Sequence, residues 1–192
     1  METIKNIHTR RSIRNYSDQP VSNEELQEIL EAGTWAPSGV NLQPWYFVAL
    51  HSPEERAKME EIMVRVSDRL EPSLKARFAT APSVVDETVT FVRSLGGAPV
   101  YILAFQLKPD YENAADMVNL SIGAALENIL LSANDKGLGT CWLTAPVETQ
   151  VGDELRDLFA PGKGSLVALV TLGYPEKEGK APKRKDGRFV II

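Results

Sequence analysis

The sequence predicts a mixed α/β fold, either α+β or three layers in which helices cover both sides of a sheet. Helical and strand patterns alternate loosely along the chain, and no internal repeat is visible. The segment 113–136 carries apolar residues almost all the way round, which is typical of a helix buried inside such a layered structure. The chain has 192 residues, close to the length of one typical domain, so we expect a single domain over residues 1–192.

The first two predicted helices have clear start signals. Ser22 and Glu25 form a capping-box pattern, and Gly33 can end the helix that follows. Ser52, followed by a proline and a glutamate, repeats the start signal for a longer helix that runs towards Pro72. The apolar positions at helical spacing are Leu26, Ile29 and Leu30, and then Met59, Ile62, Met63, Val66 and Leu70.

The strands are predicted from short apolar runs that are rich in aromatic and β-favouring residues and bounded by Pro, Gly or Ser. Further helices are expected where apolar residues recur at helical spacing. The predicted strands are residues 45–50, 100–107, 140–144 and 166–174, and the helices between them are residues 83–95, 113–136 and 151–158.

Two features predict a second copy of the chain. A small domain rarely surrounds a helix as long and as apolar as residues 113–136, so a partner is expected to cover one side of it. Residues 188–192 end in four apolar side chains, which would be an aggregation hazard if left free. We therefore expect this tail to add as a strand to a sheet, its own or that of a partner, and we expect a homodimer.

The composition excludes several classes of protein. With 43% hydrophobic and 24% charged residues the chain is globular, and a net charge of −5 argues against nucleic acids and anionic membranes as partners. One cysteine, Cys141, cannot form an intrachain disulfide or hold an iron–sulfur cluster or thiolate zinc, so no metal site is predicted and electron transfer would need an organic cofactor. Residues 1–14 are polar and basic, unlike a signal peptide or membrane anchor, which predicts a cytoplasmic location.

Basic residues cluster at both ends of the chain. If the two clusters meet, they form a pocket suited to a phosphate, because guanidinium groups bind phosphate oxygens in a bidentate fork. The spacing of residues 10, 11, 12 and 14 could place them around one turn, facing one ligand. The alternative is that both clusters are solvated ends that keep the protein soluble. The clusters are Lys5, Arg10, Arg11 and Arg14, with Ser12 as a further donor, and Lys177, Lys180, Lys183, Arg184, Lys185 and Arg188.

A polar loop joins the first predicted helix to the first predicted strand. Pro37 and Pro44 restrict its backbone, Gly39 permits close approach by another group, and three polar side chains offer hydrogen bonds. A planar ring with polar edges would suit such a loop. The alternative is a turn whose polar side chains satisfy nearby backbone groups and whose two tryptophans belong to the core. The polar residues are Ser38, Asn41 and Gln43, and the tryptophans are Trp35 and Trp45.

Four segments together resemble the signatures of the nitroreductase family, whose members depend on flavin mononucleotide (FMN). Residues 10–14 and 36–45 look like its two N-terminal signatures, residues 137–143 resemble the third, and residues 172–175 followed by residues 183–185 resemble the fourth. The resemblance spans the whole chain. It implies a nitroreductase-like fold with a central, mainly antiparallel sheet flanked by helices. It also implies an intertwined homodimer that exchanges C-terminal strands and holds two FMN sites lined by both chains.

The resemblance further implies which residues contact FMN. Residues of both basic clusters would hold the phosphate and the ribityl chain, the polar loop of the other subunit would contact the isoalloxazine ring, and two backbone amides would face its reactive edge. There an N–H stabilises the electron density that accumulates on reduction. The phosphate residues would be Arg10, Arg11, Ser12 and Arg14 with Lys183 and Lys185, and with Arg184 as an equally placed substitute. The ring residues would be Pro37, Ser38, Gly39 and Asn41, with the amides of Thr144 and Ala145.

The implied reaction is a ping-pong transfer in which NADH or NADPH reduces FMN and leaves before a small-molecule electron acceptor binds. Nitroaromatics, quinones and similar compounds are compatible acceptors, and neither His8 nor His51 is expected to be catalytic. Residues 65–97, including Phe78 and Phe91, either shape the acceptor pocket or pack in the core. The alternatives are a specialised flavin relative, such as a reductive dehalogenase or a flavin-fragmenting enzyme, and a non-catalytic FMN-binding protein.

Overall fold

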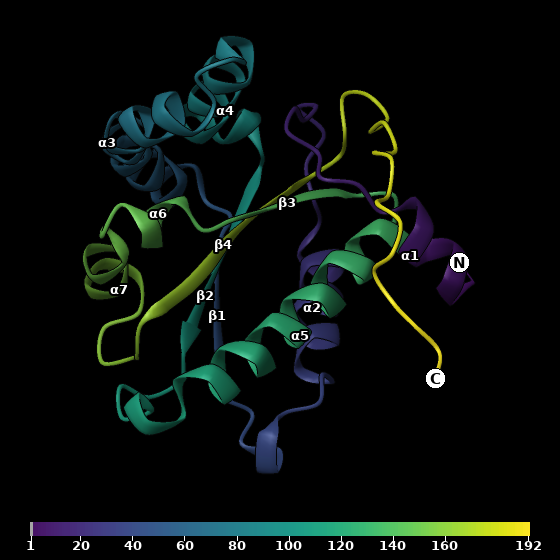
Figure 1. The fold of residues 1–192 in the computed structure, drawn as a ribbon. Helices are drawn as coiled ribbons and strands as arrows, with labels where there is room; N and C mark the ends of the chain where they lie inside the picture. Colours follow the sequence, from purple (N-terminus) through teal and green to yellow (C-terminus); the bar gives the residue numbers. More distant parts are fainter. Residues whose placement is uncertain (1) are drawn as a thin grey trace.

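A computed structural model describes residues 2–192 and contains a four-stranded sheet with helices on both of its faces (Figure 1). All of the strand pairs are antiparallel, in the order β1-β2-β4-β3, which confirms the predicted mixed α/β class with a mainly antiparallel sheet. The strands are β1 (Trp45–Leu50), β2 (Val100–Gln106), β3 (Gly139–Leu143) and β4 (Leu166–Gly173). The helices are α1 (Thr3–Thr9), α2 (Asn23–Thr34), α3 (Pro53–Arg77), α4 (Pro82–Ser94), α5 (Ala115–Asp135), α6 (Ala145–Glu148) and α7 (Gly152–Phe159). Short 3₁₀ turns lie at Gly39–Asn41, Leu95–Gly97 and Glu112–Ala114.

The sheet separates two hydrophobic cores. Successive residues of a strand point to opposite faces, and β2 is buried on both. Its residues Ile102 and Ala104 pack with α2 and α5, whereas Tyr101, Leu103 and Phe105 pack with α3, α4 and α7. A central strand buried on both sides explains why residues 100–105 form a continuous apolar run. None of the helices in residues 2–192 combines the length and apolarity needed to cross a membrane.

Helix α2 begins as predicted but does not end as predicted. The Ser22 hydroxyl accepts a hydrogen bond from the Glu25 N–H (3.1 Å), and the Glu25 carboxylate accepts one from the Ser22 N–H (2.9 Å). The helix then continues past Gly33, so the prediction that this glycine ends it is wrong. Gly33 instead allows close packing on α5, because a Cβ there would lie 2.8 Å from Cγ1 of Ile129.

Helix α3 begins at the predicted position and passes through Pro72. The Ser52 hydroxyl accepts a hydrogen bond from the Glu55 N–H (3.3 Å), as the start signal predicts. Proline removes one intrahelical hydrogen bond and usually ends a helix, yet α3 continues beyond Pro72 for more than a turn. Leu70 and Leu74, on either side of the exposed proline, are both buried in the core, and this packing outweighs the missing bond.

The two chain ends differ from the expectations. Residues 3–9 form α1, which no sequence pattern predicted, and residues 188–192 form no strand with the sheet of their own chain. In the described chain the tail (yellow in Figure 1) runs past α1 with Phe189 and the three following apolar residues exposed. Among the described residues of one chain the tail adds to no sheet, and strand exchange with a partner stays a prediction.

Candidate functional site

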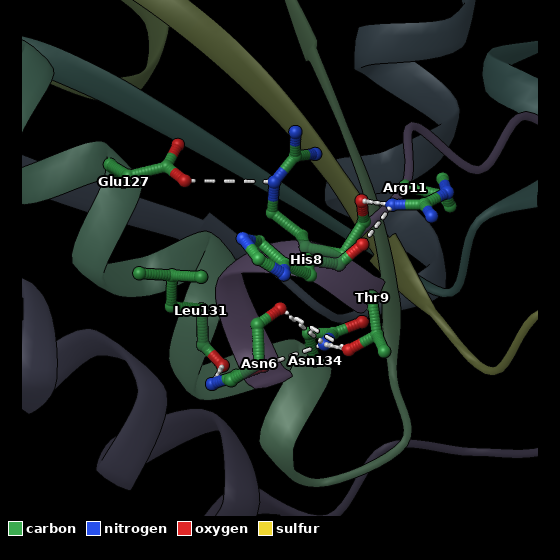
Figure 2. Close-up of polar contacts among 8 residues, drawn as sticks. Asn6, His8, Thr9, Arg11, Glu127, Leu131 and Asn134 are labelled. Carbon is green, nitrogen blue, oxygen red and sulfur yellow. Dashed lines mark hydrogen bonds and ion pairs between the residues drawn. The ribbon is translucent and has the colours of Figure 1, made fainter. Parts of the chain in front are cut away.

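Side-chain hydrogen bonds join helix α1 to the second half of α5, as Figure 2 shows. The Asn6 amide donates a hydrogen bond to the Leu131 carbonyl (3.0 Å). The Asn134 amide donates to Oδ1 of Asn6 (2.6 Å) and to the Thr9 hydroxyl (3.1 Å). Because these contacts come from a long, buried helix, they fix where the chain leaves α1 and where the basic residues that follow are placed.

Residues 10–16 are extended and cross the ends of β3 and β4. The Ile13 N–H donates to the Thr140 carbonyl (2.9 Å), and Gly139 makes room for Ile13, because a Cβ at residue 139 would lie 2.6 Å from Cγ1 of Ile13. The buried Tyr16 hydroxyl donates to the Ile13 carbonyl (2.7 Å) and lies 2.7 Å from the Thr171 hydroxyl. Burial raises the pKa of Tyr16, so its hydroxyl stays protonated and remains a donor.

The prediction that residues 10–14 wind around one turn is wrong, because their backbone bonds to β3. Even so, four of these residues face one cavity of about 340 Å³, and the C-terminal tail closes it. The two basic clusters thus meet in space, and the lining carries five cationic side chains and no carboxylate. The lining residues are Arg10, Arg11, Ser12 and Arg14 from the N-terminal segment, and Lys180, Pro182 and Arg184 from the tail.

Of the three tail residues that the family resemblance implies, the cavity is lined by the substitute and not by the two lysines. Arg184 lines the basic cavity, but Lys183 and Lys185 are not among its lining residues. Lys180 takes part instead. The tail has no regular periodicity, so the sequence marks it as basic without showing which of its side chains turn inward.

Arg11 has a donor that no described group satisfies. Its Nη1 donates to the carbonyls of His8 and Arg10, both at 2.7 Å (Figure 2), and Arg10 itself forms an ion pair with Glu127 (Nε to Oε1, 3.6 Å). Within residues 2–192, Nε of Arg11 is buried and has no hydrogen-bond partner. Leaving such a donor unsatisfied costs about 1–3 kcal/mol, so an anionic oxygen beside it would be stabilised.

A second cavity of about 230 Å³ shares Arg14 with the basic cavity. Most of its lining residues are apolar, and apart from Arg14 they come from α3, α4 and the segment 141–148. The Arg14 guanidinium lies 5.7 Å from the centroid of the Phe91 ring, a cation–π contact that holds it where the two cavities meet. Phe91 lines this cavity and Phe78 does not, so the segment 65–97 contributes to both the cavity and the core.

Thr144 and Ala145 both line the second cavity, at the start of α6. The Thr144 hydroxyl donates to the Glu148 carboxylate, which also faces this cavity. Cys141 lies in the same wall, where burial raises the pKa of its thiol. A neutral thiol is a poor nucleophile, so we do not expect Cys141 to react with a ligand in this cavity.

The polar loop lies far from the basic cavity of its own chain. The Gly39 N–H donates to the Ser121 hydroxyl (3.2 Å), and Gly39 packs on Met117, near the beginning of α5. Helix α1 contacts the same helix at Leu131, which is 14 residues further on and therefore roughly 21 Å away. One chain does not bring Pro37, Ser38, Gly39 and Asn41 together with the basic cavity.

The loop satisfies part of its polar content internally, as the alternative interpretation of this segment predicts. The Ser38 hydroxyl accepts from the Gln43 N–H (3.0 Å), and Asn41 Oδ1 accepts from the Gln43 side-chain amide (3.0 Å). Trp45 belongs to the core, but Trp35 does not, because it is 80% exposed. Contacts within one chain do not explain why Trp35 is exposed to solvent.

Comparisons with known proteins agree with this arrangement. Residues 7–174 match the sequence model of the Nitroreductase family. A protein from Archaeoglobus fulgidus, provisionally named NADH dehydrogenase/NAD(P)H nitroreductase, is 33% identical over 189 residues, or 98% of this chain and 93% of the relative. Iodotyrosine deiodinase 1 from Rattus norvegicus is 30% identical over 195 residues, or 97% of this chain and 67% of the relative.

Solved structures point the same way. The crystal structure of a Desulfovibrio desulfuricans protein, provisionally named a nitroreductase and in complex with FMN, superposes with a TM-score of 0.70 at 28% identity. The match covers 100% of this chain and 96% of the other. With a family model that matches most of the chain and a relative that is 33% identical over nearly all of it, the chain belongs to the nitroreductase family.

Proposed function

We propose that the protein is an FMN-dependent oxidoreductase that passes electrons from NADH or NADPH to a small aromatic or quinone acceptor by a ping-pong mechanism. The observation that carries the proposal is the meeting of two unlike cavities at Arg14, one lined by cationic residues and one lined by more apolar than polar residues. A molecule with a phosphate at one end and a flat ring at the other needs this combination. The complex of the Desulfovibrio desulfuricans structure with FMN supports the same cofactor.

The residues present fit such a molecule. The unsatisfied Nε of Arg11 and the carboxylate-free lining of the basic cavity suit a phosphate, which accepts charge-assisted hydrogen bonds from guanidinium groups. Arg14 would bridge the phosphate end and the ring end. The volumes, about 340 and 230 Å³, are consistent with a small-molecule site that extends over both cavities.

Bound FMN would supply the redox chemistry, taking a hydride from the nicotinamide and passing two electrons to the acceptor. The residues of the chain itself would position the cofactor and shield it from water. Backbone N–H groups at Thr144 and Ala145 begin α6 and have no intrahelical acceptor, so they can donate to a ring edge in the second cavity. Leu74 and Phe91 would exclude water from that ring, which would strengthen each hydrogen bond made there.

The first test is the colour and chemistry of the purified protein. We expect a yellow protein that releases FMN on denaturation, bleaches when NADH or NADPH is added without oxygen, and gives parallel double-reciprocal plots when donor and acceptor are varied. A protein that binds FMN but does not bleach would be a binding protein without catalysis. A colourless protein that takes up no added FMN would refute the proposal.

We also propose that the functional unit is a homodimer. The polar loop lies about 20 Å along α5 from the basic cavity of its own chain, so a second chain would have to supply it. Large apolar side chains are exposed on α5 and on the segment that contains the polar loop, where a partner would cover them. They are Leu120 on α5 (76% exposed), and Trp35 and Val40 (80% and 89% exposed). Large apolar residues grouped in this way are typical of an interface.

A groove at the edge of the sheet supports the exchange of tails. β1 pairs with β2 on one side alone, and a hollow of about 750 Å³ lies between β1 and α2. Leu26, Leu30, Trp45 and Phe47 are among its lining residues. The apolar residues 189–192 of a partner chain would bury themselves there and pair with the free strand edge.

Shortening Leu120 to alanine is expected to weaken the dimer by about tenfold, because it removes apolar contact at the proposed interface. Sedimentation at falling protein concentration would measure the dissociation constant, and bound FMN should fall together with the dimer. Leu158→Ala, which shortens a 47% exposed leucine on α7, is the matched control. A monomer that retains full FMN content would contradict the shared site.

The similarity to iodotyrosine deiodinase 1 supports a second candidate, reductive removal of a halogen from an aromatic ring in the same cavity. The cofactor contacts would be unchanged. Release of iodide from an iodinated phenol under anaerobic conditions with a flavin reductant would favour it. Reduction of a nitroaromatic without any dehalogenation would favour the first candidate.

A further inference from the structure

Besides Arg14, the second cavity has another guanidinium without a polar partner among the described residues. Arg77, the last residue of α3, lines this cavity and is exposed at its rim. Among residues 2–192 the Arg77 guanidinium makes one cation–π contact, with the Phe78 ring, whose centroid lies 5.5 Å away. The ring holds the guanidinium in place without neutralising its charge.

The other arginines of α3 and α4 are engaged elsewhere. Arg65 forms a bidentate pair with Glu154 (3.0 and 2.6 Å), and Arg93 pairs with Asp68. Arg56 donates to the Ala98 carbonyl (3.4 Å), and Arg69 donates to the Thr149 carbonyl (3.2 Å). None of these four arginines lines the second cavity. Arg77 is thus the arginine of this helical pair that faces the cavity and remains available to a ligand.

The charges around the cavity favour an anion near Arg77. Its lining carries Arg14, Arg77 and one carboxylate, that of Glu148, which accepts a hydrogen bond from the Thr144 hydroxyl. Residues 35–45, which a second chain would contribute, include no aspartate or glutamate. If Arg14 is occupied by the cofactor, Arg77 is the cation that a second ligand meets, beside the apolar wall of Leu70 and Leu74.

We propose that Arg77 is a specificity-determining residue that selects electron acceptors whose aromatic ring carries a carboxylate. The ring would pack against the apolar wall while the carboxylate receives charge-assisted hydrogen bonds from the guanidinium. This inference rests on the proposed function and names the substrate class for the same site. It does not alter the cofactor contacts, because Arg77 does not line the basic cavity.

Binding of two matched ligands tests the inference without turnover. Benzoate and benzamide have nearly the same shape and differ in charge, and either one bound over the flavin should perturb its absorption spectrum. In Arg77→Gln the ratio of benzoate affinity to benzamide affinity should fall about tenfold, a loss of the size expected for one charge-assisted contact. In wild type, benzoate binding should also weaken as salt is added, and in the variant this dependence should be smaller.

Lys75→Gln is the matched control. It removes the same charge from the same turn of α3, but Lys75 pairs with Glu71 (2.8 Å) and does not line the cavity. The control should keep the wild-type ratio. An unchanged ratio in Arg77→Gln, or an equal fall in both variants, would overturn the proposal.

Turnover kinetics show whether Arg77 acts on the electron acceptor or on the electron donor. With Arg77→Gln, KM for 4-nitrobenzoate should rise about tenfold while KM for 4-nitrobenzamide and the rate of flavin reduction by NADH stay the same. Slower reduction by NADH with unchanged use of 4-nitrobenzoate would overturn the inference, because the anion would then be the pyrophosphate of the donor. If Arg77→Gln reduces both acceptors as wild type does, the role of Arg77 is refuted and the proposed function still stands. If the wild-type protein contains no FMN and takes up none, the proposed function is refuted as well.

Discussion

Replacement of Arg14 by alanine is expected to weaken FMN binding by about 10- to 100-fold. Arg14 is the residue that lines both cavities, and its guanidinium lies over Phe91 without an ion pair among the described residues. A hydrogen bond to a charged group contributes about 1.5–3 kcal/mol, which corresponds to this range of dissociation constants. The stability of the fold should change little, because the backbone bonds of residues 12–16 do not involve this side chain.

Titration of the flavin-free protein with FMN, followed by quenching of flavin fluorescence, measures the effect. Arg156→Ala is the control, since Arg156 is ion-paired with Asp153 and Asp157 on α7 and lines neither cavity. Arg14→Lys should recover part of the affinity, because it keeps the charge and loses the bidentate fork. Equal affinities for wild type and Arg14→Ala would remove Arg14 from the binding site.

Gly96→Ala is expected to destabilise the protein by about 3 kcal/mol or more, because it combines backbone strain with an overlap. Gly96 has a φ of +66°, and a Cβ there would overlap the carbonyl oxygen of Arg14. The same glycine accepts a hydrogen bond from the Tyr16 N–H (3.2 Å). The substitution would therefore push the N-terminal segment away from the strand ends.

Gly97→Ala separates the two causes. Gly97 has nearly the same φ, +70°, but a Cβ there would meet nothing within 4 Å. Only the strain of about 1–2 kcal/mol should remain, and urea unfolding would measure the difference between the two variants. FMN should also leave Gly96→Ala faster than Gly97→Ala, because only the first displaces Arg14. Equal stabilities would show that the contact between Gly96 and Arg14 does not constrain the segment.

Local patterns in the sequence predict most of the elements of this fold. The run at residues 45–50 is apolar, β-favouring and bounded by prolines, and it forms β1 at the same residues. The capping box at Ser22 is complete. The failures at Gly33 and Pro72 have one cause, namely that packing against another element outweighs a local preference.

The candidate site could be predicted in composition but not in geometry. A concentration of charge at both ends is visible in the sequence, and the structure brings these ends to one cavity. Residues 10–14 are extended because they bond to Thr140, a partner that no local pattern reveals. The packing of distant segments determines which tail residues turn inward. It also determines that Arg77 faces a cavity.

The crossing of the strand ends by residues 10–16 also affects the order of folding. Ser12 bridges to Thr140 and Tyr16 bridges to Pro175, so residues 12–16 are synthesised long before the segments with which they pair. Contacts so distant in sequence form slowly, since loop closure must precede them. The basic cavity is completed by Arg184 and does not exist on a nascent chain that is still shorter. We therefore expect FMN to bind only after Arg184 has been synthesised and the tail has closed the cavity.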